Sequence, residues 1–223
     1  MKNFYKLIPK EFNTKYHNPG FAKHGINIPF RALIVGSSGS GKTNLLMNLI
    51  HIMSGTFEKL IICCKSADEP LYKFVKSKLK NDVEFYEGGC EAIPKLDSLK
   101  NCGQTLIVFD DLCNEKDQSV IIDYLIRGRK IGSGISSVYL TQSFFKTPKT
   151  VRTQCNYIFL KKVGNKRDLN TILTDNSLNI EKKQLQELYE YCTQRLEDFL
   201  LIDVAAPDSK RFRYNFEPIC GRS

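Results

Sequence analysis

The chain has 223 residues, of which 42% are hydrophobic and 26% are charged; these values are typical of a globular protein with one substantial core and exclude extensive disorder. No apolar run approaches the ~20 residues that span a bilayer, and residues 1–12 lack the apolar stretch of a secretory signal, so we expect a soluble intracellular protein with no membrane partner. The 33 Lys and Arg against 24 Asp and Glu give a formal net charge of +9, which favours a polyanionic partner but also fits a generic basic surface.

Residues 1–28 are polar and aperiodic and contain several prolines and glycines, so they are expected to form an irregular arm ahead of one folded domain, residues 29–223. The apolar run Ala32–Val35 then predicts a short buried strand, and apolar residues recur at helical spacing from Leu45 to Met53. Between the strand and the helix lies GSSGSGKT, a full match to the GxxxxGK[ST] pattern of phosphate-binding loops. This phosphate loop comprises Gly36, Ser37, Ser38, Gly39, Ser40, Gly41, Lys42 and Thr43.

The chemistry of this loop requires these residue types in this order. Its glycines let backbone N–H groups wrap a polyphosphate at a helix N-terminus, Lys42 can reach the β and γ phosphates, and Thr43 can bind a magnesium ion. A Gly/Ser turn that matched by chance would not need a strand before it and a helix after it. The sequence therefore predicts a nucleoside triphosphate and Mg²⁺ as ligands.

The eight cysteines form no CxxC pair and the three histidines are isolated. We therefore interpret the cysteines as reduced thiols, several of them small core residues, and expect no metal site beyond nucleotide-bound magnesium. This leaves the phosphate loop as the starting point for the function.

Beyond the loop, short apolar runs alternate with helical patterns as far as the C-terminal region. Strands are expected at 59–64, 83–86, 105–109, 135–140 and 156–160, helices at 71–79, 120–125 and 185–196, a connection at 87–103, and a β-hairpin at 199–204 and 211–216. Strands that alternate with helices around a phosphate loop indicate an α/β fold. We predict a three-layer P-loop NTPase with an open, mostly parallel central sheet and a C-terminal β-hairpin.

The run TLIVF ends on Asp110 and Asp111, and an apolar strand that closes on acidic residues is typical of a buried strand ending at an active site. In a Walker B strand, Asp110 would hold magnesium through water and Asp111 would orient and deprotonate the attacking water. Alternatively, Asp111 only caps the following turn. Gln142 ends the next predicted strand, where a carboxamide could contact the γ phosphate and the lytic water, although turn chemistry would also explain it.

Four segments carry a more specific resemblance: RALIVGSSGSGKTNLL, TLIVFDDL, RGRK and SSVYLTQSFFKTPKTVRTQCNYIFL. Together they resemble the genome packaging ATPases of poxvirus-like large DNA viruses and their virophage relatives, which belong to the FtsK/HerA superfamily of ASCE motors. The similarity runs from about Arg31 to Leu173. The combination of phosphate loop, acidic pair and strand-terminal glutamine is much more specific than the loop alone.

The resemblance implies a homo-oligomeric ring, expected to be a hexamer, that hydrolyses ATP between subunits and moves double-stranded DNA into a preformed capsid. It assigns phosphate and metal binding to Lys42 and Thr43, metal binding to Asp110, the catalytic acid to Asp111 and the sensor to Gln142. Many superfamily members have Glu where this chain has Asp111, so the position of the lytic water can differ here. Capsid vertex proteins would be further partners, and the host cytoplasm at the site of viral assembly the expected location, with retention in the virion left open.

Such motors complete their site with an arginine from the neighbouring subunit, and this finger accelerates phosphoryl transfer by about 10³ to 10⁵. The candidates are Arg152, Arg129 and Arg127, in that order, although each could equally be a phosphate contact or a surface charge. The DNA-contact candidates are the lysines Lys65, Lys146 and Lys149.

Two alternatives remain open from the sequence. Asn165–Asp168 reads NKRD after an apolar run, which resembles the guanine-recognition motif of Ras-like GTPases, but no glycine follows Asp110 at the spacing of the DxxG motif. A P-loop kinase would need an arginine-rich lid, and positions 140–169 offer only Arg152 and Arg167.

Overall fold

The computed structural model describes residues 2–9, 15–79, 82–177 and 180–219. In these ranges, nine strands form one sheet in the order β3-β2-β4-β5-β1-β6-β7-β8-β9. The strands are β1 Arg31–Val35, β2 Lys59–Cys64, β3 Val83–Glu87, β4 Thr105–Asp110, β5 Ile135–Thr141, β6 Tyr157–Leu160, β7 Leu200–Asp203, β8 Phe212–Tyr214 and β9 Glu217–Pro218. The first six are mutually parallel, whereas β7, β8 and β9 each pair antiparallel with the preceding strand.

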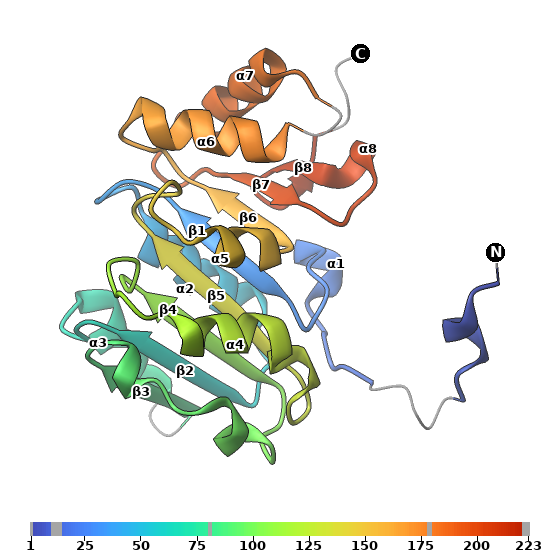
Figure 1. The fold of residues 1–223 in the computed structure, drawn as a ribbon, viewed down its shortest axis with the longest axis vertical. Coiled ribbons are helices and arrows are strands. Elements are labelled where there is room, and N and C mark those ends of the chain that lie inside the picture. Colours follow the sequence, from blue (N-terminus) through green and yellow to red (C-terminus); the bar gives the residue numbers. More distant parts are fainter. Residues whose placement is uncertain (1, 10–14, 80–81, 178–179, 220–223) are drawn as a thin grey trace.

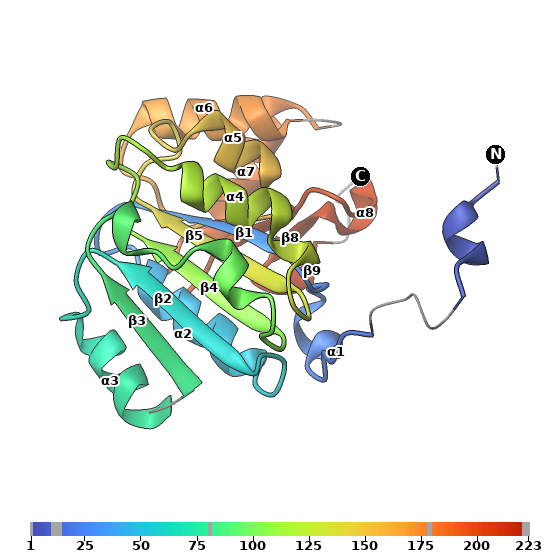
Figure 2. The ribbon, with the colours of Figure 1, turned by 60° about the horizontal axis from the view of Figure 1, so that its bottom comes forward.

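Helices cover both faces of the parallel part of the sheet, as Figures 1 and 2 show. One face carries α2 and α3, and the other carries α4, α5, α6 and α7. The α-helices are α1 Phe21–His24, α2 Lys42–Ile52, α3 Pro70–Leu79, α4 Ser119–Arg127, α5 Lys149–Gln154, α6 Lys166–Asn176, α7 Lys182–Cys192 and α8 Asp208–Arg211, and the 3₁₀ helices are η1 Phe4–Leu7, η4 Cys90–Ala92, η5 Leu96–Leu99 and η6 Gly128–Lys130. The predicted three-layer α/β fold with a mostly parallel sheet and a C-terminal hairpin is confirmed.

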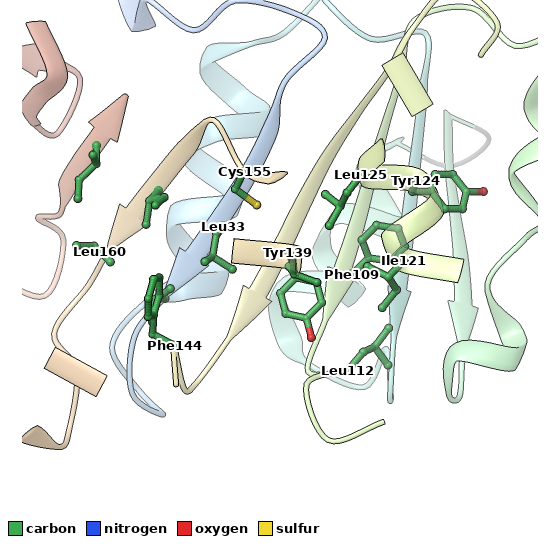
Figure 3. Close-up of a cluster of buried hydrophobic side chains, with 14 of the residues drawn as sticks. Leu33, Phe109, Leu112, Ile121, Tyr124, Leu125, Tyr139, Phe144, Cys155 and Leu160 are labelled. Atoms are coloured by element: carbon green, nitrogen blue, oxygen red, sulfur yellow. The ribbon is translucent and has the colours of Figure 1, made fainter. Parts of the chain in front are cut away.

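Burial explains why the central strands read as continuous apolar runs. Every residue of β5 is buried, and in β4 only the terminal Asp110 is partly exposed, because helices cover both faces. Figure 3 shows one of the two layers of core, in which Phe109 and Tyr139 of the sheet meet Ile121 and Tyr124 of α4.

The late helix is shorter than predicted. Its apolar stripe was expected to reach Leu196, but α7 ends at Cys192 and the Leu196 side chain is 60% exposed. The chain leaves the helix at Thr193, whose hydroxyl donates to the carbonyl of Tyr189, and then crosses to the sheet edge where β7 begins. Spacing alone could not reveal this early end, because Leu196 continues the helical period.

Part of the segment expected to be irregular packs against the domain. Ile26 is fully buried, and α1 is followed by a contact in which Arg213 of the hairpin donates to the carbonyls of His24 and Gly25. Arg213 also forms a buried ion pair with Asp203 at 2.5 Å. The C-terminal hairpin therefore holds the chain that leads into β1, and the boundary at residue 28 stays a prediction.

Seven cysteines lie in the described ranges, all as free thiols, and Cys220 lies outside them. Four are buried core residues, as interpreted from the sequence: Cys63, Cys64, Cys155 and Cys192. Among the helices that the structure describes, none is both long and apolar enough to cross a membrane.

Candidate nucleotide-binding site

The predicted functional segments meet at one edge of the sheet, where the parallel strands have their C-terminal ends. Asp110 ends β4 in register with the penultimate residue of β5, and Val35 of β1 pairs with Thr141, the last residue of β5. Because β5 lies between β4 and β1, Gln142 stands between the acidic pair and the phosphate loop. This arrangement is the crevice in which open α/β sheets bind ligands.

The phosphate loop has the backbone that a polyphosphate cradle needs. Gly41 adopts φ +83°, and a side chain at Gly36 would place its Cβ 2.4 Å from Ser40 Oγ and 2.6 Å from Lys161 Cβ. Only glycine fits either place. The Ser40 hydroxyl is buried and has no hydrogen-bond partner among the described residues, so a polar atom in the loop is left for a ligand.

Lys42 begins helix α2, and its side chain folds back over the loop. Its Nζ donates to the Ser37 carbonyl at 3.0 Å. Burial lowers the pKa of Lys42, and the nearby carboxylates of Asp110, Asp111 and Glu69 oppose this shift. A partly buried cation in a loop of backbone N–H groups fits the phosphates of ATP.

Asp110 is held by a residue that the sequence analysis did not single out. The hydroxyl of Tyr72, on α3, donates to Asp110 Oδ2 at 2.6 Å. Burial raises the pKa of Asp110, with this hydrogen bond acting in the opposite direction. A desolvated carboxylate near the hydroxyl-bearing start of α2 is a suitable donor set for Mg²⁺, which prefers oxygen ligands. Thr43 and Asp110 would hold it.

Asp111 has an unusual backbone conformation for a non-glycine residue, with φ +56°. Asp and Asn adopt positive φ more readily than other non-glycine residues, and such backbone conformations cluster at functional sites. Its exposed carboxylate lies 3.5 Å from the Nε2 of Gln142. In the described residues, no backbone N–H donates to Asp111, so the turn-cap alternative has no supporting hydrogen bond, and the catalytic roles of Asp111 and Gln142 stay predictions.

Lys161 is a buried residue of the site that no sequence motif marks. It follows β6, is 2% exposed, and its Nζ donates to the carbonyls of Leu196 and Asp198. Burial lowers its pKa. Its side-chain carbons lie close to two loop glycines, since a Cβ atom added at Gly36 would lie 2.6 Å from Lys161 Cβ and one added at Gly41 would lie 3.7 Å from Lys161 Cε. This lysine therefore packs against the phosphate loop. In the sequence, this role is indicated only by the position of the lysine directly after an apolar strand.

The NKRD segment has a structural role that conflicts with guanine recognition. Asp168 is 1% exposed and accepts hydrogen bonds from Ser143 Oγ, Phe145 N–H and Asn165 Nδ2 at 2.7 to 2.8 Å. Both carboxylate oxygens are therefore engaged within the protein and shielded from solvent, which conflicts with binding the two donors of a guanine ring. It ties the segment after Gln142 to the start of α6.

The arginine candidates lie away from the phosphate loop of their own chain. Arg127 ends α4 and pairs with Asp123 at 2.8 Å. Arg129 lies in η6, whose Gly128 packs against Ile135 at the N-terminal end of β5, whereas the phosphate loop lies at the C-terminal ends of the strands. Arg152 pairs with Asp175 at 2.8 Å and stacks over a buried phenylalanine ring. Because a trans-acting arginine serves the neighbour's site, these positions do not decide between the three, and the assignment stays a prediction.

Comparison with known proteins gives one family and a group of solved structures. The sequence model of the family described as "Poxvirus A32 protein" matches residues 21–203. No curated protein sequence matches the chain.

Among the solved structures, the DNA-packaging ATPase B204 from Sulfolobus turreted icosahedral virus has a TM-score of 0.63 and 18% identity over 87% of this chain and 100% of that chain. The genome packaging NTPase B204 from Sulfolobus turreted icosahedral virus 2, in complex with ATP-gammaS, has a TM-score of 0.59 and 19% identity over the same shares. EssC (ATPases 2 and 3) from Geobacillus thermodenitrificans has a TM-score of 0.50 and 9% identity over 69% of this chain and 36% of that chain. Because the sequence identities are this low, the structural similarity establishes the fold alone.

Proposed function

The chain belongs to the poxvirus A32 protein family, and we propose that it is an ATPase that uses ATP hydrolysis to move double-stranded DNA into a preformed viral capsid. The observation that carries the proposal is the meeting of the phosphate loop, the acidic pair and Gln142 at one edge of the sheet. The packaging role named for its structural relatives B204 supports the same reading. The GTPase alternative is not favoured, because Asp168 is 1% exposed and both of its carboxylate oxygens already accept hydrogen bonds from within the protein.

In the proposed reaction, the loop N–H groups and Lys42 bind the β and γ phosphates, and Asp111 accepts the proton of the attacking water. Gln142 orients that water and registers whether the γ phosphate is present. Bound Mg²⁺ would neutralise charge on the phosphates, with Thr43 and Asp110 as its holders on this chain. The carboxylate of Asp111 is exposed and lies 3.5 Å from Gln142 Nε2, which supports the proposal that the two side chains act together on one water.

A ring of identical subunits, expected to be a hexamer, would complete this site. Among the described residues, no arginine is seen to form a hydrogen bond or an ion pair with Lys42, Asp111 or Gln142, although the transition state gains from such a cation. A neighbour's Arg152, Arg129 or Arg127 would supply it. Hydrolysis could then be coupled to closure of the subunit interface.

We place the DNA contact on the segment that follows Gln142. Phe145 is 42% exposed, and the guanidinium of Arg167 lies 3.5 Å from its ring centroid. Lys146 is the next residue and is exposed, and exposed cations such as Lys146 and Arg167 suit the phosphates of a duplex backbone. Of the other candidates, Lys149 is exposed, whereas Lys65 forms an ion pair with a carboxylate, Glu115.

We include capsid vertex proteins as further partners and the host's cytoplasmic assembly site as the location.

The experiment that tests ATP-driven movement along DNA is displacement of a labelled third strand from a long linear duplex. The wild-type protein should release the third strand only when ATP is present, and Lys42→Ala should not release it. A wild-type protein that hydrolyses ATP but never displaces the strand would contradict the translocation step.

A further inference from the structure

Tyr72 connects a core helix to the acidic residue at the tip of β4. It lies in the first turn of α3, is 1% exposed, and packs edge-on against Phe85 with ring centroids 5.8 Å apart. Its hydroxyl reaches out of this apolar layer to Asp110 Oδ2 at 2.6 Å. The ring and the hydroxyl therefore have separable roles, because the ring fills the core and the hydroxyl faces the site.

This hydrogen bond fixes the orientation of a carboxylate. An O–H donor at 2.6 Å from an ionised oxygen is a strong, charge-assisted contact, and it occupies one of the two carboxylate oxygens. The other oxygen, Oδ1, accepts no hydrogen bond from the residues that the structure describes, and the carboxylate lies near enough to Lys42, at the start of α2, for the two charges to interact. Hydrogen bonds of this kind orient metal ligands in many proteins, and losing them typically lowers metal affinity about 10- to 100-fold.

We propose that Tyr72 is a positioning residue that holds Asp110 in the orientation needed for the nucleotide-bound divalent cation. The proposal rests on the function proposed above, because it requires a metal–nucleotide complex at this edge. The same contact links α3 to the metal side of the site. No sequence motif marks it, since Tyr72 reads as one apolar position of an amphipathic helix.

The test compares Tyr72→Phe with Tyr124→Phe. Both tyrosines are 1% exposed and hydrogen-bonded, but the hydroxyl of Tyr124 donates to the Pro94 carbonyl at 2.8 Å, away from the crevice. Each variant is titrated with Mn²⁺ in the presence of ATPγS, with electron paramagnetic resonance reporting free Mn²⁺. ATPγS binding without metal is measured on the same samples.

Tyr72→Phe should lower the Mn²⁺ affinity of the ATPγS complex by about 10-fold or more, whereas metal-free ATPγS binding stays at the wild-type level. Tyr124→Phe should match the wild type in both measurements. The inference is overturned if Tyr72→Phe keeps wild-type Mn²⁺ affinity, or if it loses metal-free nucleotide binding as well, since a general disruption would indicate a purely structural residue. A wild-type protein that binds ATPγS without any effect of Mn²⁺ would instead refute the metal–nucleotide site itself.

Discussion

The buried carboxylate of Asp168 offers a quantitative test of the site's framework. It accepts three hydrogen bonds, from the Ser143 hydroxyl, the Phe145 N–H and the Asn165 amide, and Asp168→Ala would remove all three. Each bond to a charged acceptor is worth about 1.5 to 3 kcal/mol, but exposed Asn165 can turn to water after the change. We therefore expect a loss of about 3 to 5 kcal/mol rather than the full sum.

For a chain of this size, each kcal/mol corresponds to about 2 to 4 °C in Tm, so Asp168→Ala should melt about 6 to 20 °C below the wild type. Asp168→Asn keeps an acceptor oxygen and should lose less. Asp117→Ala is the control, since that exposed carboxylate accepts from the local Ser119 N–H and should change Tm little. Circular dichroism measures the melting, and ATP and GTP affinities are compared at low temperature.

Two results would refute this reasoning. A wild-type Tm for Asp168→Ala would mean that the carboxylate does not hold the segment after Gln142. A selective loss of GTP binding, with stability unchanged, would instead support guanine recognition by the NKRD segment.

Three further predictions concern the site, the DNA surface and the cysteines. Lys42→Ala should abolish ATP turnover. Asp111→Asn should bind ATP normally but hydrolyse it at least ~100-fold more slowly, because a general base is worth about 10² to 10⁴ in rate. Wild-type turnover by Asp111→Asn in a coupled ATPase assay would show that Asp111 is not the base. Arg167→Ala should weaken duplex binding and flatten its salt dependence relative to an exposed control, Lys182→Ala, in fluorescence anisotropy, and identical salt slopes would exclude this surface. Burial raises the pKa of four core thiols to about 12, namely those of Cys63, Cys64, Cys155 and Cys192. They should therefore stay protonated and unreactive toward Ellman's reagent at mildly alkaline pH until the protein unfolds. Rapid labelling of these four thiols in the native protein would contradict their burial.

The sequence predicts the fold and the main site segments because their signals are local. A phosphate loop between a strand and a helix, and a buried strand that ends in Asp110, are readable from residue order alone. Parallel pairing then brings the strand ends to one edge, which explains why Gln142 and Asp111 come within 3.5 Å.

Long-range contacts account for what the sequence did not reveal. Tyr72 lies 38 positions from Asp110, and Lys161 binds the carbonyl of Asp198 across 37 positions. The local sequence around Tyr72 resembles that of any tyrosine in the core, and the local sequence around Lys161 resembles that of any lysine on the surface. Asp168 is the opposite case, since a local motif suggested ligand binding and tertiary contacts occupy the carboxylate.

The central claim is that ATP splitting at this edge of the sheet is coupled to double-stranded DNA. Its most direct test is the ATPase rate of the wild-type protein as long duplex DNA is added at low ionic strength. The rate should rise with duplex of any sequence and fall back as salt is increased. A rate that stays the same with every duplex offered, in a protein that binds and hydrolyses ATP, would contradict the claim.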